Sequence, residues 1–322
     1  MSSFAEPVPG AATYRSQSMS TICYVTLAIG PEYRRHARRL LADIQHVSPG
    51  IPLVVLTDTP RAFGDAIAVQ HRPQSVGIYH DKLDCLAACR ELGFETWIFL
   101  DADCRLLGDV TTARPWHRGI TVKNAVPLDR HLDDRDRLSA SAFNQRRRKL
   151  LEEIAATYDL GLDRALMLNE SVLIAHALGE RFDDFAREWR AVRDFLELHA
   201  INSGEGAAIG LAALRSDIAV HHYDRSYEIS PDARDAIDIF KDNFFFRGTE
   251  LRTEKRGVSE RRSQLLNIEQ QRRQIARSPK LVKLWRKARS AFGKLMRRWK
   301  LQHRYRAGSS QAPRFRDVIQ HF

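Results

Sequence analysis

Three short apolar runs, separated by segments with helical spacing, constrain the fold of this 322-residue chain more than any other feature. The runs are residues 21–29 (TICYVTLAI), 52–57 (PLVVLT) and 95–100 (ETWIFL). Between them, apolar residues recur at helical spacing over residues 32–45 and 81–92. Continuous apolar runs are typical of strands buried on both faces, and strands that alternate with helices form parallel sheets. The sequence therefore predicts an α/β fold with a doubly wound, mostly parallel, Rossmann-like sheet.

The pattern is less regular further along the chain. Residues 165–175 predict a strand or a strand and turn, and residues 181–198 predict a long amphipathic helix. A second helix is expected over residues 207–214, and a short strand over residues 218–220. Residues 126–147 are polar and charged, so we expect a loop or a partly helical insertion there.

Charge divides the chain into regions. Of its 51 basic and 40 acidic residues, 21 basic and four acidic ones follow Glu250. The preceding part is therefore mildly acidic, although the whole chain carries a net charge of +11. Such a change of sign indicates a boundary. We predict a disordered segment over residues 1–20, a globular domain over residues 21–250 and a basic helical tail over residues 251–322.

Several classes of protein are disfavoured by what the sequence lacks. There is no apolar stretch of the roughly 18 residues that a transmembrane helix needs, and residues 1–20 contain no apolar core of a signal peptide. The four cysteines have no spacing typical of a zinc site or a disulfide framework. Cys23 and Cys104 lie in apolar runs, which predicts buried free thiols. We therefore expect a cytoplasmic protein.

The motif Asp101-Ala102-Asp103 directly follows the third apolar run. In a doubly wound sheet, ligands bind beyond the carboxyl ends of the strands, so we expect this motif at the binding edge. Side chains alternate along a strand, so Asp101 and Asp103 should point the same way. Two adjacent carboxylates repel each other unless a cation joins them, and Mg²⁺ or Mn²⁺ prefers such oxygen ligands. The alternative is a structural turn or a helix N-cap, where Asp is also common.

A resemblance to a known family rests on Lys82-Leu83 and on the run Ile98-Phe99-Leu100-Asp101-Ala102-Asp103. These residues resemble the core of GT-A-type nucleotide-diphospho-sugar glycosyltransferases, and are most similar to the glycogenin and galactosyltransferase-like group. The resemblance covers about residues 20–225. It implies a metal-dependent, hexosyltransferase-type enzyme that moves a sugar from a nucleotide diphosphate sugar, with a UDP-sugar favoured. The acceptor would be a glycan or a lipid-linked molecule, as in polysaccharide biosynthesis.

The resemblance also implies which residues bind the donor. The residues expected to bind the nucleotide sugar are Thr26, Ala28, Asp58, Lys82 and Asp101. The residues expected to hold Mn²⁺ or Mg²⁺ are Asp101, Asp103 and His222. After His222 the sequence departs from the group, because Asp224-Arg225-Ser226-Tyr227 stands where the group has Gly-x-x-Lys-Pro-Trp.

Two acidic residues are candidates on the acceptor side. A carboxylate at Glu170 or Glu205 could act as the base on an acceptor hydroxyl, or could bind a hydroxyl of the donor sugar. The alternatives are a solvated loop end for Glu170 and a helix-start residue for Glu205.

The basic tail has three interpretations. Ser278-Pro279 predicts the start of a helix, after which apolar residues recur at steps of three and four and Lys and Arg fill the other positions. This helix could lie on an anionic membrane surface, pack on the globular domain or bind nucleic acid. We favour the membrane surface because Trp285 and Trp299 flank the apolar stripe, whereas no nucleic-acid-binding module is visible. A peripheral location on the inner membrane face would follow.

Two other functions compete with sugar transfer. One is a non-catalytic protein that binds nucleic acid or a membrane and in which the two aspartates are structural. The other is a sugar nucleotidylyltransferase, which would share the fold but needs a Gly-rich phosphate loop near its N-terminus. Residues 28–32 (AIGPE) do not form such a loop, which disfavours the second alternative.

Overall fold

The computed structural model of the chain describes residues 21–104, 106, 109, 116–138, 141–222, 280–305 and 313–322. Within these ranges, the side chains of residues 135–138 and 280–289 are outside the description. The predicted disorder of residues 1–20 and the predicted helix start at Ser278-Pro279 fall outside the described residues.

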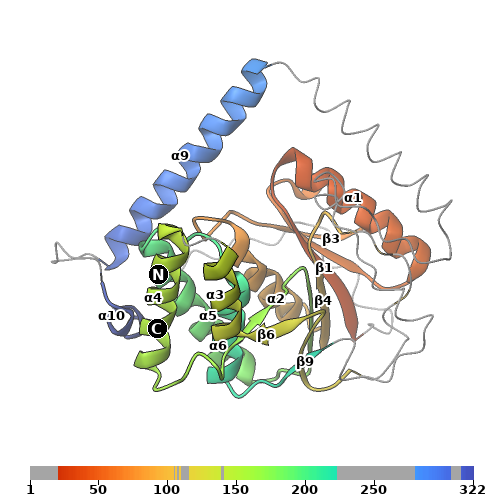
Figure 1. Cartoon of the computed structure of the whole chain (residues 1–322). Helices are drawn as coiled ribbons and strands as arrows, with labels where there is room; N and C mark the ends of the chain where they lie inside the picture. Colours follow the sequence, from red (N-terminus) through yellow and green to blue (C-terminus); the bar gives the residue numbers. More distant parts are fainter. Residues whose placement is uncertain are drawn as a thin grey trace.

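A seven-stranded sheet forms the centre of the domain, with the strand order β3-β2-β1-β4-β8-β5-β9 (Figure 1). Its strands are β1 (Ile22–Ala28), β2 (Leu53–Thr57), β3 (Ile67–Gln70), β4 (Thr96–Leu100), β5 (Gly119–Val122), β8 (Val172–His176) and β9 (Val220–His222). Strands β3, β2, β1 and β4 pair in parallel, as do β5 and β9, whereas β8 is antiparallel to both of its neighbours. The predicted doubly wound, mostly parallel α/β sheet is therefore confirmed.

Helices cover both faces of this sheet, as the continuous apolar strands require. Helix α1 (Gly30–Val47) packs on one face, where Leu40 joins the strand residues Ile98 and Leu100. The other face is covered by α2 (Lys82–Glu91), α5 (Arg181–Leu198) and α6 (Glu205–Arg215), and contains Phe99 and Trp189. Alternate residues of β4 thus enter two separate cores, which is why its sequence is apolar throughout.

The charged segment predicted as a loop or partly helical insertion is largely helical. It contains β6 (Ala125–Pro127), α3 (Leu128–Leu138) and the first part of α4 (Ala142–Thr157). Strand β6 pairs with β7 (Leu166–Leu168) in a separate two-stranded sheet. The Oγ atom of Ser141 accepts a hydrogen bond from the backbone N–H of Asn144, which caps α4. Arg148 and Asp133 pair at 2.7 Å, so part of the charge in this segment joins the two helices.

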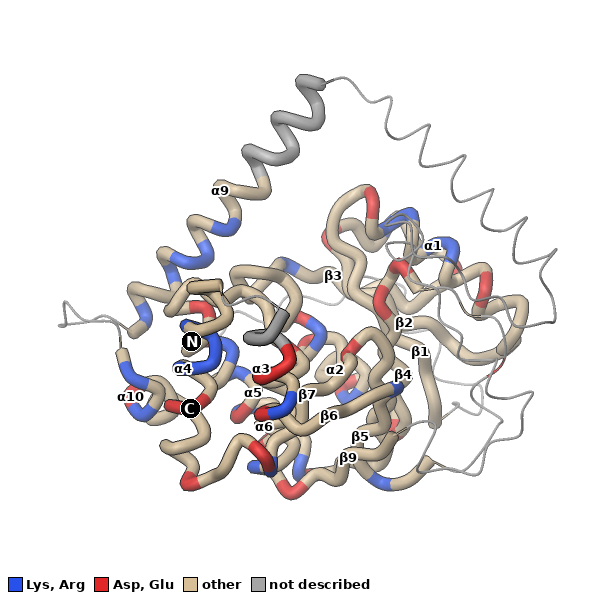
Figure 2. Tube along the Cα trace, in the orientation of Figure 1, with Lys and Arg blue, Asp and Glu red and all other residues tan. Residues whose placement is uncertain are grey.

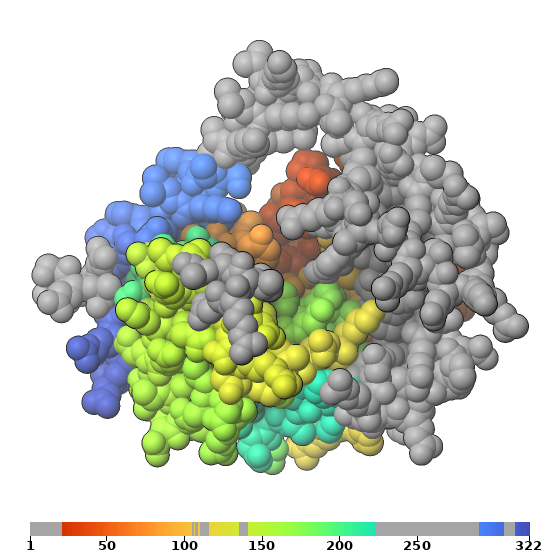
Figure 3. Space-filling model, viewed as in Figure 1, coloured from red at the N-terminus to blue at the C-terminus, as the bar shows by residue number. Residues whose placement is uncertain are grey.

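The C-terminal part of the chain is not detached from the domain. Helix α9 (Lys280–Tyr305) contacts α5, and α10 (Phe315–Ile319) packs against α4 and α5. In the space-filling view, the blue C-terminal residues lie against the yellow-green ones (Figure 3). The side chains of Phe315 and Val318 are fully buried in the main core. No described helix combines the length and the apolar character needed to cross a membrane. Two short 3-10 helices, η2 (Pro60–Ala62) and η3 (Tyr79–Asp81), complete the described elements.

Candidate functional site

The candidate site lies where the strand order of the sheet reverses. From β1 the chain proceeds through α1 to β2 and β3 on one side, and then through α2 to β4 on the other side of β1. In open α/β sheets, a ligand-binding crevice forms at such a switch point, beyond the carboxyl ends of the strands. The hydroxyl of Thr26 in β1 donates a hydrogen bond of 2.7 Å to the carbonyl oxygen of Leu100, the last residue of β4. Thr26 thus joins the two strands on either side of the switch point.

The acidic motif after β4 forms a turn rather than a continuation of the strand. The carbonyl oxygen of Asp101 accepts a hydrogen bond of 2.8 Å from the backbone N–H of Cys104. The strand ends at Leu100. The turn therefore orients Asp101 and Asp103, rather than the alternation of side chains along a strand. Burial raises the pKa of the Tyr33 phenol, and the charges of Asp103 and Asp101 raise it further. The charges of both aspartates therefore act on Tyr33, a residue that the sequence does not single out.

Lys82, the first residue of α2, is the centre of the site. Its Nζ atom lies 3.0 Å from Oδ1 of Asp101, 3.7 Å from Oε1 of Glu205 and 3.9 Å from Oε1 of Glu170. It also lies 3.5 Å from the backbone carbonyl oxygen of Glu170 and 5.4 Å from the centre of the Phe99 ring. The lysine side chain is almost completely buried. Three acidic residues predicted separately from the sequence thus meet around the ammonium group of Lys82.

The pairing of β4 with β8 brings Glu170 to this cluster. Leu100 is paired with Val172, and the backbone N–H of Asp101 donates to the carbonyl oxygen of Ser171. Because β8 is antiparallel, the turn that precedes it lies at the carboxyl ends of the parallel strands. Glu170 is in that turn, next to the end of β4, so its position follows directly from the strand register.

The close approach of α6 to β7 places Glu205 next to Lys82. A Cβ atom at Gly206 would lie 2.2 Å from the carbonyl oxygen of Leu168, and one at Gly210 would lie 1.8 Å from that of Leu166. Glycine at both positions therefore allows the helix to touch the backbone of the strand. Since Glu205 is the first residue of α6, this contact sets the distance between its carboxylate and Lys82.

Charge and burial perturb the pKa values of the cluster. Burial alone would lower the pKa of Lys82, but the charges of Asp101, Glu205 and Glu170 outweigh it and raise the pKa above its ordinary value. Burial raises the pKa of Glu170 to about 7, and the charge of Glu205 adds to the effect. Burial opposes the ionisation of Glu205, but Lys82 and other neighbours lower its pKa to about 2. At neutral pH, Glu205 is thus ionised while Glu170 is poised to gain or lose a proton.

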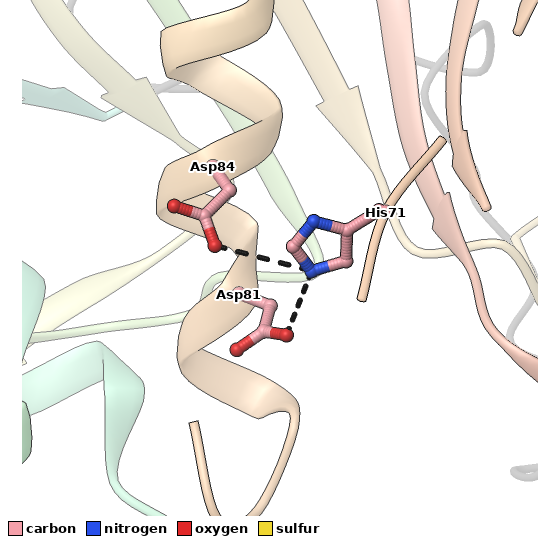
Figure 4. Close-up of side chains that lie close together, drawn as sticks. All are labelled: His71, Asp81 and Asp84. Carbon is pink, nitrogen blue, oxygen red and sulfur yellow. Dashed lines mark hydrogen bonds and ion pairs between the residues drawn. The ribbon is translucent and has the colours of Figure 1, made fainter. Parts of the chain in front are cut away.

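A second cluster of ionisable side chains joins His71, at the start of the loop before α2, to Asp81 and Asp84 at the beginning of α2 (Figure 4). The Nε2 atom of His71 donates to Oδ2 of Asp81 at 2.8 Å and lies 3.9 Å from Oδ2 of Asp84. The carboxylate of Asp81 also accepts the backbone N–H groups of Ser75 at 2.7 Å and Gln74 at 2.9 Å. Both of its oxygens are therefore occupied by protein donors. We assign this cluster to holding the loop that precedes Lys82.

The rest of this loop is also tightly held. The backbone N–H of Gly77 donates to Oε1 of Glu197 at 3.0 Å, and a Cβ atom at Gly77 would lie 2.2 Å from the carbonyl oxygen of Asn202. Ile78 has a φ of 72°, which is rare for a β-branched residue. Such strain persists only where surrounding structure imposes it, and it often occurs at functional sites. The next residue is Tyr79, whose ring is exposed.

The remaining predicted residues lie apart from Lys82. The carboxylate of Asp58 accepts hydrogen bonds from Arg34 and from the backbone N–H of Gly30, at the start of α1. Ala28 is buried, and its carbonyl oxygen accepts the hydroxyl of Thr57 at 2.8 Å. His222 is on the edge strand β9, and β8 and β5 separate that strand from β4. Three strand spacings of about 4.8 Å place its backbone about 14 Å from β4.

The donor atoms of the site suit a hard divalent cation. Asp101 and Asp103 offer carboxylate oxygens, which Mg²⁺ and Mn²⁺ prefer, and the remaining positions around such an ion would be left for phosphate and water. Among the described residues, three metal-binding side chains come within 4.8 Å of one another only at His71, Asp81 and Asp84. The metal site expected at the Asp101 turn would therefore rest on its two aspartates and on the ligand's own oxygens.

Comparisons with known proteins find likeness at the level of structure alone. No family model and no curated protein matches the sequence. Among the solved structures that match is the galactosyltransferase LgtC in complex with donor and acceptor sugar analogs. It is 12% identical to this chain with a TM-score of 0.39, and the match covers 66% of this chain and 82% of LgtC.

The described structure also contains a cavity of about 360 Å³, at a different place from the carboxylate cluster. It lies beside Gly119 and Ala219, at the amino ends of β5 and β9, and is lined by Arg118 and Arg181 among others. Arg181 is paired with Asp217 at 3.1 Å. The chemistry of the Lys82 cluster, and not the volume of this cavity, therefore identifies the candidate site.

Proposed function

We propose that this chain is a metal-dependent glycosyltransferase that takes a sugar from a nucleotide diphosphate sugar, with a UDP-sugar favoured. The observation that carries the proposal is the contact of Lys82 with Asp101, Glu170 and Glu205 at the switch point of the sheet. A switch point of this kind is the usual ligand-binding position in such sheets. The resemblance of the sequence around Lys82 and Asp101 to nucleotide-diphospho-sugar transferases supports the same assignment.

The charges of the cluster suit this reaction. In the proposal, Asp101 and Asp103 would hold Mn²⁺ or Mg²⁺ together with the diphosphate, and such an ion would supply positive charge that offsets the charge of the leaving diphosphate. Lys82 orients Asp101 by its ion pair and holds Glu205 in its ionised form. Glu170, with its raised pKa, takes the proton from an acceptor hydroxyl as that oxygen attacks the sugar. The acceptor is a glycan or a lipid-linked molecule.

Calorimetry of UDP binding with Mn²⁺ and with EDTA tests this proposal. We expect binding only with the metal, and we expect Asp103→Ala to abolish it. Asp217→Ala is the matched control, because Asp217 is an exposed carboxylate at the other edge of the sheet. Binding of UDP in EDTA that equals binding with Mn²⁺, or no binding of any nucleotide, would overturn the proposal. Salt-sensitive nucleic-acid binding that survives Asp103→Ala would instead favour a non-catalytic protein.

A further inference from the structure

Helix α9 carries a row of large apolar side chains that do not pack on the domain. Phe292 is 64% exposed, Leu295 63%, Met296 38% and Trp299 51%. These residues are spaced by three, one and three positions, so they form one stripe about 100° wide along the helix. A contiguous exposed stripe of this kind is uncommon on a protein that has no partner for it.

The opposite side of the helix is attached to the domain. Leu301 is buried, and the hydroxyl of Tyr305 donates a hydrogen bond of 2.8 Å to Oδ2 of Asp194 in α5. Arg304 donates to the same oxygen at 3.3 Å, and Arg297 donates to the carbonyl oxygen of Val76 at 3.2 Å. These contacts fix which face of α9 points to solvent. The apolar stripe is therefore directed away from the domain, and it is not the surface on which α9 packs.

Basic side chains border the stripe. On the helix, Arg298 and Lys300 lie on either side of the apolar residues, and Lys300 is exposed. Figure 2 shows Lys and Arg along the described half of α9, which stands clear of the sheet in Figure 1. An apolar stripe bordered by cations matches the boundary between the acyl chains and the anionic headgroups of a bilayer. A nucleic-acid backbone would match the charges but not the exposed Phe292 and Leu295.

We infer that α9 is an interfacial helix, which docks the chain on an anionic lipid surface through Phe292, Leu295, Met296 and Trp299. The inference goes beyond the proposed sugar transfer and does not depend on it. It makes the protein peripheral to a membrane, on the inner face if the chain is cytoplasmic. Because Arg297 binds the loop that leads to Lys82, docking would also hold that loop near the lipid surface.

Co-sedimentation of the full chain with vesicles tests the inference. We expect binding to phosphatidylcholine vesicles that contain phosphatidylglycerol, and much weaker binding to phosphatidylcholine alone. Phe292→Gln with Leu295→Gln should weaken binding at least about tenfold, because two large apolar side chains no longer enter the bilayer. Lys300→Glu should weaken binding to the anionic vesicles by at least about fivefold, because each basic residue near such a surface contributes about fivefold.

Matched controls are available on α4. Phe143 is an exposed apolar residue, and Arg146 and Lys149 are exposed basic residues. Phe143→Gln, and Arg146→Glu with Lys149→Glu, should leave vesicle binding unchanged. All these side chains are exposed, so thermal unfolding should show that each variant folds. Vesicle binding that is unaffected by the α9 variants would overturn the inference, as would a dimer that Phe292→Gln with Leu295→Gln dissociates while no vesicle binding is seen.

Discussion

The ion pair between Lys82 and Asp101, with 3.0 Å between Nζ and Oδ1, joins the beginning of α2 to the residue that follows β4. Lys82 is the first residue of α2, and Asp101 follows the strand into which that helix leads. Two further carboxylates, from Glu170 and Glu205, lie within 4 Å of the same ammonium. One positive charge does not balance three carboxylates. The excess negative charge of the site can be reduced by a proton on Glu170 or by an additional cation. Either change would lower the repulsion of an anionic diphosphate.

Removing the ammonium should strongly destabilise the fold. We expect Lys82→Met to lower the free energy of unfolding by about 3–5 kcal/mol at pH 7, because it leaves uncompensated buried carboxylates. The raised pKa of Lys82 means that its stabilising effect is present at all pH values below about 10, the ordinary lysine value, and is lost only above it. The loss in the variant should be smaller at pH 4.5, where Glu170 is already protonated in the folded state. Urea unfolding in EDTA at the two pH values measures this.

The ion pair of Arg90 with Asp183 provides a control for Lys82. Both side chains of this pair are more than a third exposed, so Arg90→Met should lower the free energy of unfolding by less than about 1 kcal/mol. An equal effect of the two substitutions would contradict the central role of Lys82.

Glu170→Gln should change how stability depends on pH. The folded state holds a proton on Glu170 up to about pH 7, whereas an unfolded chain releases it near pH 4.5. The folded state therefore binds more protons in this window, and this residue lowers stability as pH rises from about 4.5 to 7. Glutamine cannot ionise, so the variant should gain up to about 2 kcal/mol relative to the parent across this range. Urea unfolding in EDTA between these pH values measures the difference.

The same variant tests the proposed role of Glu170 as a base. Sugar transfer should fall at least about 100-fold in Glu170→Gln and should lose its rise with pH. Glu197→Gln is the matched control, because burial also raises the pKa of Glu197 to about 7 but its carboxylate binds the backbone of Gly77. A normal rate in Glu170→Gln, or the same loss in both variants, would argue against the role of Glu170.

Much of the fold could be predicted from the sequence because its signals are local. The apolar run of β4 and the helical spacing of α5 are each contained in one segment, and the structure has them within a residue or two of the predicted bounds. The position of β8 could not be predicted in this way, because it depends on pairing between Leu100 and Val172, which are distant in the sequence. The sequence does not predict strand β5 (Gly119–Val122).

In the candidate site, too, the residues can be selected from local sequence, whereas their contacts depend on long-range pairing. Lys82, Asp101, Glu170 and Glu205 were each selected from the sequence, yet their contact depends on the register of β8 and on the approach of α6. His71 and Tyr33 were not selected. His71 acts through a partner ten residues away in a folded loop, and Tyr33 in α1 is affected by the charges of Asp101 and Asp103, which lie about 70 residues later in the chain. No residue pattern along the chain encodes these two interactions.

Gly210→Ala should disturb the contact that places Glu205. The new Cβ atom would lie 1.8 Å from the backbone carbonyl oxygen of Leu166, so α6 must move away from β7. We expect a loss of about 1–3 kcal/mol in the free energy of unfolding and weaker binding of UDP with Mn²⁺. Gly64→Ala is the control, since nothing lies within 4 Å of its Cβ position. Its stability should stay within about 1 kcal/mol of the parent, and equal effects of both substitutions would contradict the packing argument.

Phe315→Ala tests whether the end of the chain is part of the globular domain. The Phe315 ring is fully buried and meets Tyr158 and Phe195 edge-on, with ring centres 5.1 and 5.3 Å apart. Removing a buried aromatic ring lowers the free energy of unfolding by about 3–5 kcal/mol, and we expect a loss in this range in urea. Phe322→Ala, at an exposed ring seven positions later, should change it by less than about 0.5 kcal/mol. If the two variants unfold alike, α10 does not contribute to the core. If Phe315→Ala alone is destabilised, deleting the whole basic tail would destabilise the globular domain, and the proposed membrane role of α9 must be tested by point substitutions.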